Sequence, residues 1–361
     1  MHHVRMMRRT ATAAAGAWAD DATVTFVLPD PGHKLAGVRL QQDLRIPADL
    51  LNFRRIGDNW ELVIKRPPVH RMEYLLELSY PGGGAATVPD PANPLQVAGA
   101  FGAKSVVEFP SYLPPAWLSA AAPPGRVSTI ELPDRSLGAS VQVRTWAPAG
   151  TPAGARLPLL VVHDGPEYDS LASLTRYLAA GVAGQWLPRL RAALLSPGPR
   201  NRWYSANANY ARALRHTVLP ALGLALPTSL HIGMGTSLGG LAMLHAHCQY
   251  PDAFDALFMQ SGSFFMPSFD SQESRFPYYR RITKFTAAVL DGGALPGRPV
   301  PAVLTCGAIE ENIANNRLMA ETLRERGYPA TLYEVPDMHN YTAWRDAFDP
   351  CLTGLLHQVH T

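Results

Sequence analysis

The sequence predicts an α/β protein with a mostly parallel central sheet, preceded by a small all-β domain. From about residue 127 onward, strand-length apolar runs alternate with helix-length amphipathic runs. Several of the strand-length runs are apolar almost throughout, which is typical of parallel strands covered by helices on both faces. Between residues 22 and 110 the runs are shorter and are separated by turns rich in Gly and Pro, which indicates a β-sandwich.

The composition argues against several classes of protein. Hydrophobic residues make up 47% and charged residues 17% of the 361 residues, which is enough apolar material for two domains with cores. The net charge of +3 is too small to indicate a nucleic-acid or anionic-membrane partner, and no apolar run approaches the roughly 20 residues of a membrane span. The three cysteines (Cys248, Cys306 and Cys351) lie far apart and fit neither a disulfide framework nor a metal site. We therefore expect a cytoplasmic protein without metal or cofactor.

The first third of the chain divides into three segments. Residues 1–21 are basic and then alanine-rich, with only a short apolar stretch, so we expect a disordered tail rather than an export signal. Residues 22–110 carry the strand-like runs V-T-F-V-L, G-V-R-L-Q-Q-D-L-R-I, N-W-E-L-V-I-K and E-Y-L-L-E-L-S-Y. Residues 111–126 are rich in Pro and Ala, and proline disfavours both helix and sheet, so we expect a stiff linker.

The remaining residues, 127–361, hold the predicted parallel sheet. The expected strands are V-Q-V-R-T-W-A-P, L-P-L-L-V-V-H-D, L-R-A-A-L-L-S-P, S-L-H-I-G-M-G, A-L-F-M-Q-S-G, P-A-V-L-T-C-G and A-T-L-Y-E-V-P. The clearest amphipathic helices are expected at 210–222, 238–250, 313–327 and 342–357.

A serine between glycines marks the junction of one such strand and helix. The stretch G-T-S-L-G at 235–239 matches the G-x-S-x-G nucleophile elbow, in which a sharp turn lifts the serine hydroxyl clear of the sheet. Glycine is needed two residues to either side because side chains there would collide with the neighbouring strand and helix. This predicts Ser237 as a nucleophile and the N–H of Leu238 as an oxyanion donor. A phosphate-binding loop is disfavoured, because no Gly-Lys-Ser/Thr follows.

A serine nucleophile needs a histidine base that is oriented by a carboxylate, and in elbow enzymes the chain order is Ser, acid, His. His339 follows the last expected strand and precedes the last helix, which is the place for the base. Glu310 follows the preceding strand, and we favour it as the acid. Glu311 and Asp337 remain alternatives, since a carboxylate at a helix N-terminus is also stabilising without any catalytic role.

These stretches resemble the putative-esterase family of α/β-hydrolases, and most closely the enterochelin (ferric enterobactin) esterases. The resemblance rests on G-T-S-L-G-G-L-A-M-L, L-F-M-Q-S-G-S-F-F, C-G-A-I-E-E-N-I-A-N-N-R-L and H-N-Y-T-A-W-R, and in the front part on D-P-A-N-P and F-G-A-K-S. It implies an α/β-hydrolase catalytic domain at 127–361, an Ig-like N-terminal domain, Glu310 as the acid and His339 as the base.

The chain also departs from the family pattern. Asp337-Met338 stands where relatives commonly carry Gly-Gly, and Trp203 stands where they often carry an acidic residue. Pro166 has no N–H, so Gly165 or Glu167 must supply the second oxyanion donor, and we favour Gly165. The residues expected to bind substrate are Asp164, Glu167, Tyr168, Arg200, Trp203, Ser261 and Trp344.

The predicted function is a serine esterase acting on a small-molecule carboxylic ester, either a siderophore trilactone or an aromatic acyl ester. The segment 264–295 carries the aromatic and arginine residues Phe269, Phe276, Tyr278, Tyr279, Arg280 and Arg281. They suit an aromatic or anionic acyl group, or equally a packed lid. Two alternatives remain: an acyltransferase with the same triad, or a carbohydrate-binding protein whose hydrolase domain is inert.

Overall fold

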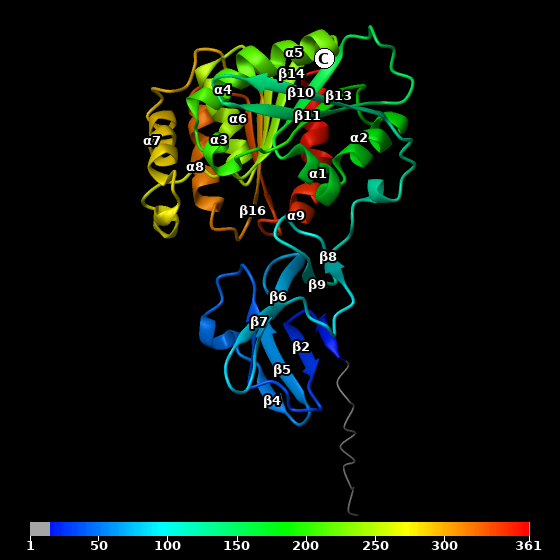
Figure 1. The fold of residues 1–361 in the computed structure, drawn as a ribbon, viewed down its shortest axis with the longest axis vertical. Coiled ribbons are helices and arrows are strands. Elements are labelled where there is room, and N and C mark those ends of the chain that lie inside the picture. The colour runs from blue at the N-terminus through cyan, green and yellow to red at the C-terminus, as the bar shows by residue number, and fades with distance from the viewer. Residues whose placement is uncertain (1–14, 361) are drawn as a thin grey trace, which may run out of the picture. The chain divides into compact units, whose positions relative to one another are not determined.

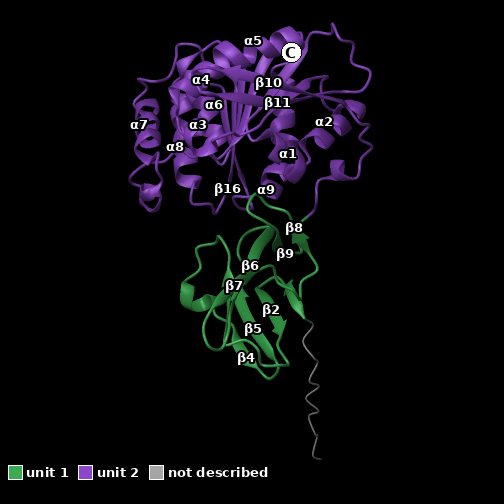
Figure 2. Cartoon of the chain, in the orientation of Figure 1, with its two compact units in different colours: residues 1–112 green, residues 113–361 purple. Residues whose placement is uncertain are grey.

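The computed structural model describes residues 15–360, and Figure 1 traces its ribbon. The chain forms two compact units, residues 1–112 and 113–361, which Figure 2 colours separately. Within the described part of the chain, no helix is both long and apolar enough to cross a lipid bilayer.

The first unit consists of two β-sheets. Its strands are β1 (Gly16–Ala19), β2 (Thr23–Pro29), β3 (Gly37–Gln41), β4 (Arg54–Ile56), β5 (Asn59–Lys65), β6 (Arg71–Ser79), β7 (Ala85–Val88), β8 (Gln96–Val97) and β9 (Lys104–Glu108), with a short turn of helix η1 (Ala48–Leu51). One sheet has the order β1-β2-β5-β4; the other has the order β3-β6-β9-β8, with β7 added to β6. The ring of Phe26 on β2 meets the ring of Tyr74 on β6 edge-on at 5.0 Å, so the two sheets share a core.

Alternation of side chains explains how β5 joins that core. Trp60, Leu62 and Ile64 are buried, whereas the side chains between them are partly or fully exposed, as a strand with one face toward a core requires. The sequence prediction of an all-β domain in this region is confirmed.

The N-terminal segment differs from expectation where it is described. Residues 16–19, predicted as part of a disordered tail, form β1, which pairs antiparallel with β2 from Gly16 opposite Val27 to Ala19 opposite Val24. The strand lies at a sheet edge and is held mainly by backbone hydrogen bonds, and its Trp18 is 39% exposed. The sequence therefore lacks the alternation of apolar and polar residues that would have predicted a strand here. The rest of the predicted tail, residues 1–14, lies outside the described residues.

The proline-rich segment after residue 112 is packed against the second unit. Its short helix η2 (Ala116–Leu118) buries Trp117 against the rings of Tyr177 and Phe348. The guanidinium of Arg176 donates to the carbonyl oxygens of Leu118 and Ala120. This end of the segment therefore belongs to the core of the second unit.

The second unit is built on an eight-stranded sheet of order β10-β11-β13-β12-β14-β15-β16-β17. Its strands are β10 (Arg126–Asp134), β11 (Ala139–Ala147), β12 (Leu157–Val162), β13 (Arg191–Leu195), β14 (Thr228–Thr236), β15 (Ala256–Gln260), β16 (Ala302–Gly307) and β17 (Ala330–Val335). The pairs from β13 through β17 are parallel, and β10 and β11 add an antiparallel edge. The predicted mostly parallel sheet is confirmed.

Helices cover both faces of this sheet. They are α1 (Gly165–Ala172), α2 (Leu174–Ala183), α3 (Arg200–Tyr204), α4 (Ala208–Ala213), α5 (Leu219–Ala225), α6 (Leu238–Gln249), α7 (Tyr279–Leu290), α8 (Ile313–Glu325), α9 (Tyr341–Asp346) and α10 (Thr353–Gln358), with the shorter turns η3 (Leu214–Val218), η4 (Ser271–Arg275) and η5 (Phe348–Leu352).

The apolar strands divide their side chains between the two helical layers. On β12, Leu159 and Val161 join the core formed with α3 to α8, whereas Leu160 and Val162 join the core formed with α1, α2, α9 and α10. A strand buried on both faces has no polar side to alternate, which accounts for the continuous apolar run in the sequence. Because the parallel strands all end at one edge, the loops that follow them gather there (Figure 1).

Candidate functional site

The candidate catalytic residues all follow carboxyl ends of parallel strands. Ser237 follows β14, Glu310 follows β16, and His339 follows β17, while Asp164 and Gly165 come after β12. Loops at this edge of a doubly covered sheet are where ligands bind in open α/β folds, because the helices leave that edge uncovered.

Ser237 occupies a sharp turn between β14 and α6. Its backbone has φ +54° and ψ −122°, a combination that a residue with a side chain rarely adopts and that costs on the order of 1–3 kcal/mol. The turn requires glycine beside it, since a Cβ on Gly235 would lie 2.4 Å from the carbonyl carbon of Gly239. Backbone hydrogen bonds hold the strained residue: the Ser237 N–H donates to the Gln260 carbonyl, and the Ser237 carbonyl accepts from Ser263 N–H.

Two helices begin with backbone N–H groups that are free to donate to a negatively charged atom. Leu238 is the first residue of α6 and Gly165 is the first residue of α1, and neither N–H has an acceptor among residues 15–360. The Asp164 N–H, by contrast, donates to the Tyr204 hydroxyl at 3.3 Å. N–H groups at helix N-termini are suited to stabilise a developing negative charge.

His339 and Glu310 form a close pair. The distance from His339 Nδ1 to Glu310 Oε2 is 2.9 Å, and the Glu310 side chain is 2% exposed. Burial alone would raise the pKa of the Glu310 carboxyl, but the charge and hydrogen bond of His339 hold this pKa below its usual value. Burial likewise opposes the charged imidazole, yet the Glu310 carboxylate raises the pKa of His339 above 6.5.

The second carboxylate oxygen of Glu310 is also fixed. Oε1 accepts hydrogen bonds from the Gly307 N–H at 2.8 Å and from the Ser261 hydroxyl at 2.7 Å. The Ser261 hydroxyl in turn accepts from Nε1 of Trp344 at 2.9 Å, and the Trp344 ring stands edge-on to His339. A carboxylate with this many donors stays ionised and keeps one orientation.

The two other candidate acids make different contacts. Glu311 is exposed, and its carboxylate accepts from the Gln272 amide at 3.3 Å. Asp337 accepts from its neighbour's backbone, Met338 N–H, at 2.7 Å and from the Asn340 amide at 3.3 Å. Both are engaged in local contacts, whereas the Glu310 carboxylate is bonded to His339.

A buried ion pair stands at the start of α1. The guanidinium of Arg200 donates two hydrogen bonds to the Asp164 carboxylate, at 2.9 and 2.8 Å, and Asp164 is 1% exposed. Glu167, one turn into α1, has a buried carboxylate oxygen without a hydrogen-bond partner among the described residues. Burial and the neighbouring Asp164 charge raise the pKa of Glu167. These three residues, all expected to bind substrate, form one charged group.

The remaining residues expected to bind substrate are enclosed by protein. Tyr168 is fully buried and donates its hydroxyl to Gln260 at 2.9 Å, and Trp203 is 2% exposed and stacks on Tyr210. Ser261 is fully buried and engaged with Glu310, and Trp344 is 6% exposed. This burial argues against direct substrate contact for Tyr168, Trp203 and Ser261, whose side chains support the residues in front of them.

The aromatic residues of segment 264–295 pack largely among themselves. The ring of Phe276 meets those of Phe265 and Tyr278, and Arg281 lies 4.5 Å from the centre of the Tyr278 ring. Arg281 also donates to the carbonyl of Arg202 at 2.7 Å, which ties α7 to α3. The packed-lid reading of this segment thus has more support than an open aromatic binding surface.

Sequence reasoning missed the asparagines of α8 and the serine after the Ser261 turn. The Asn316 amide accepts from Gly262 N–H at 3.0 Å and donates to the Gly262 carbonyl at 2.9 Å, so it is bonded to both peptide units that flank Gly262. Asn312 donates to the Ser261 carbonyl, and Ser263 lies beside the nucleophile. The run N-I-A-N-N could have indicated these contacts, because buried side-chain amides usually form hydrogen bonds with backbone groups.

Within residues 15–360 no cluster of three or more His, Cys, Asp or Glu side chains could hold a metal ion. The three cysteines are free thiols.

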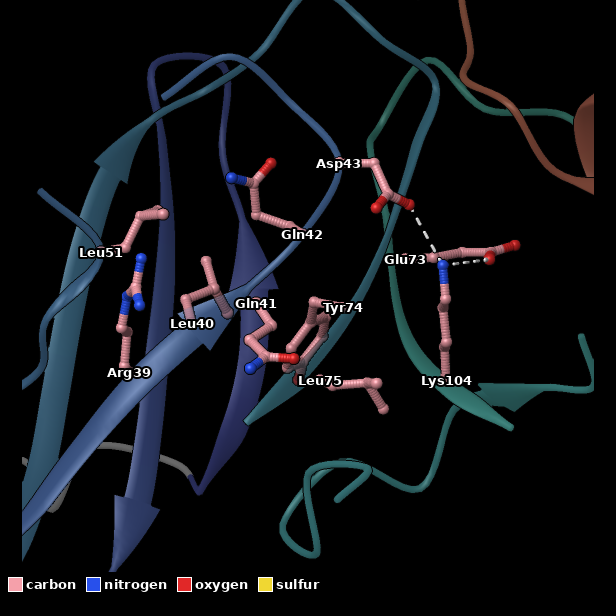
Figure 3. A pocket seen from close by; sticks show the side chains of 10 residues that line it. All are labelled: Arg39, Leu40, Gln41, Gln42, Asp43, Leu51, Glu73, Tyr74, Leu75 and Lys104. Atoms are coloured by element: carbon pink, nitrogen blue, oxygen red, sulfur yellow. Dashed lines mark hydrogen bonds and ion pairs between the residues drawn. The ribbon is translucent and has the colours of Figure 1, made fainter. Parts of the chain in front are cut away.

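A separate pocket lies in the first unit, with a volume of about 340 Å³ (Figure 3). Its lining residues are Arg39, Leu40, Gln41, Gln42, Asp43, Leu51, Glu73, Tyr74, Leu75 and Lys104. Lys104 lies 3.1 Å from the Asp43 carboxylate and 3.9 Å from that of Glu73, so these three charges are paired with one another. The pocket could hold a small polar ligand, but it lacks a nucleophile with an adjacent base.

Residues 135–355 match the family model described as "Putative esterase". The chain belongs to this esterase family. Among curated proteins, the iron(III) enterobactin esterase of Dickeya dadantii is 28% identical over 218 residues, which cover 55% of this chain. The match spans about half of that relative, 49% of its length.

Solved structures of enterobactin esterases share the fold of the whole chain. The Shigella flexneri enzyme, crystallised in the presence of enterobactin, is 21% identical, has a TM-score of 0.75, and is matched over 94% of this chain and 95% of its own. The Salmonella typhimurium ferric enterobactin esterase has 21% identity, a TM-score of 0.73 and 94% coverage of both chains. The feruloyl esterase module of Clostridium thermocellum matches 68% of this chain and 93% of its own, with 13% identity and a TM-score of 0.51. The predicted resemblance to this esterase family and the predicted fold are confirmed.

Proposed function

We propose that this esterase hydrolyses carboxylic esters through a Ser237–His339–Glu310 triad. The observation that carries the proposal is the buried Glu310 carboxylate 2.9 Å from His339 Nδ1, in the loop that follows β17. A carboxylate bonded to Nδ1 keeps the proton on that nitrogen and leaves Nε2 free to act as a base. Ser237 supplies the nucleophile on its elbow at the same edge of the sheet.

In acylation, Ser237 Oγ attacks the ester carbonyl while its proton passes to His339 Nε2. The oxyanion that forms is stabilised by the N–H of Leu238 and, as the second donor, that of Gly165. The imidazolium then gives its proton to the departing alcohol, and the acyl group stays on Ser237. Glu310 stabilises the charged imidazole through the same contact that raises its pKa.

In deacylation, His339 removes a proton from a water molecule, which attacks the acyl carbonyl. The C–Oγ bond breaks, the carboxylic acid leaves, and Ser237 Oγ recovers its proton from His339. Apart from the ester and this water molecule, every step of the proposed mechanism uses groups of the chain.

For the substrate we propose an ester that carries a hydroxylated aromatic acid, as in a catecholate siderophore trilactone. Structural relatives were crystallised with enterobactin, with 2,3-dihydroxy-N-benzoyl-serine and, for the feruloyl esterase module, with sinapinate. The side chain of Glu167 is partly exposed, so its carboxylate could accept a hydrogen bond from an aromatic hydroxyl, and the Arg200–Asp164 pair would hold the start of α1 rigid.

A substrate panel tests the proposal. We expect purified full-length protein to hydrolyse enterobactin or feruloyl esters with a kcat/KM at least about tenfold above that for an acetate ester, because acyl-group contacts contribute to transition-state binding. Products are followed by liquid chromatography with glycerol present and absent. Transfer of the acyl group to glycerol in preference to water would support the acyltransferase alternative. If no ester is cleaved and the first unit binds a carbohydrate, the carbohydrate-binding alternative is supported instead.

A further inference from the structure

We propose that Ser263 is a positioning residue that holds the Ser237 hydroxyl in its reactive orientation; this inference rests on the proposed function. The two hydroxyl oxygens lie 3.0 Å apart, a hydrogen-bonding distance. Ser263 is 2% exposed, so its hydroxyl has little access to bulk water.

The turn that carries Ser263 is fixed to the elbow from both sides. Ser237 N–H donates to the carbonyl of Gln260, and Ser263 N–H donates to the carbonyl of Ser237 at 3.1 Å. These bonds join the end of β15 to the nucleophile's own peptide units. The backbone of Ser263 is therefore fixed relative to that of Ser237, which keeps the Ser263 hydroxyl within reach of the nucleophile.

The same turn is also fixed by residues at the start of α8. The side-chain amide of Asn316 is hydrogen-bonded to the N–H and to the carbonyl of Gly262, and the amide of Asn312, the residue before α8, donates to the Ser261 carbonyl. Ser261 has φ +47°, in the left-handed region that residues with side chains seldom occupy. A strained turn persists only where its surroundings over-determine it, and such turns cluster at sites where a side chain must be held precisely placed.

The contact between the Ser263 and Ser237 hydroxyls can assist both acylation and deacylation. When Ser237 loses its proton to His339, negative charge develops on Oγ, and the Ser263 hydroxyl can donate to it. When the acyl-enzyme breaks down, the same Oγ departs from the acyl carbon with developing charge and is stabilised again. A donor that interacts more strongly with the charged oxygen than with the neutral hydroxyl lowers the barrier without tightening substrate binding.

The test is Ser263→Ala in the full-length protein, measured as kcat and KM for an ester that the wild type hydrolyses. We expect kcat to fall about tenfold, as loss of one hydrogen bond to a reacting oxygen predicts, with KM unchanged within about twofold. The pH midpoint of the acid limb stays at the wild-type value, because the His339–Glu310 pair is untouched. The control is Ser105→Ala. It also removes a buried serine hydroxyl, but in the first unit, and we expect it to keep the wild-type kcat.

The backbone bond from Ser263 N–H survives the substitution, so circular dichroism should give a melting temperature close to that of the wild type. A kcat equal to or above the wild-type value would overturn the inference, and so would a rise in KM that accounts for the whole loss of kcat/KM. Neither result touches the proposed function, which the Ser237→Ala variant tests separately.

Discussion

Replacement of Ser237 by alanine is expected to lower kcat for ester hydrolysis by about 10⁴-fold or more while the fold is retained. Without Oγ the triad has no nucleophile, and triad members act as a unit, so the remaining groups give only a small residual rate. The measurement is kcat for the best ester of the substrate panel, with active wild-type protein as reference.

Folding of this variant is checked by its melting temperature. Alanine at a position with φ +54° carries much the same backbone strain as serine, so we expect little change in stability. An alanine variant that retains half the wild-type rate would mean that the elbow serine is not the nucleophile.

Replacement of Glu310 by glutamine is expected to lower kcat by about 10³- to 10⁴-fold. The amide keeps the shape of the side chain but cannot hold the proton on Nδ1 of His339 or stabilise its charged form. The variant should also titrate differently. His339 must be neutral to act as a base, so activity falls as the pH drops through its pKa, which the Glu310 carboxylate raises above 6.5. Without that negative charge, the acid limb of kcat/KM should move to lower pH.

Two matched variants give the controls for this experiment. Glu311→Gln removes the carboxylate next to Glu310 in the sequence, and Asp337→Asn removes the one two residues before His339. We expect each variant to retain most of the wild-type kcat. A larger loss in Asp337→Asn than in Glu310→Gln would show that the acid has been assigned to the wrong residue, and an acid limb that stays in place in Glu310→Gln would show that Glu310 does not set the pKa of His339.

The parts of the site that the sequence could predict are those set by local chain geometry. The elbow needs small residues around one serine, and this requirement is visible in five consecutive letters at 235–239. The parallel strands are visible because their side chains are buried on both faces. Once those strands are placed, the residues that follow β16 and β17 must come to one edge of the sheet. The sequence therefore indicates His339 as the base and favours Glu310 as the acid, with Glu311 and Asp337 as alternatives.

The parts that escaped depend on contacts between distant segments. Ser263 and Asn316 are 53 positions apart, and they act on one turn only because β15 ends beside the start of α8. The sequence prediction places Tyr168 and Trp203 among the substrate-binding residues, but position along the chain does not tell which side of a helix faces the core, and both side chains are buried. The edge strand β1 escaped because backbone pairing leaves no pattern in the side chains.

The most direct test of the account is to identify the residue that becomes covalently modified. Wild-type protein is treated with a fluorophosphonate, whose phosphorus is attacked by an activated serine oxygen with release of fluoride, and is then digested and analysed by mass spectrometry. The account predicts one phosphonyl group, located on Ser237, with loss of esterase activity in the same proportion as labelling. An active protein that remains unlabelled, or that carries the label on another residue, would contradict it.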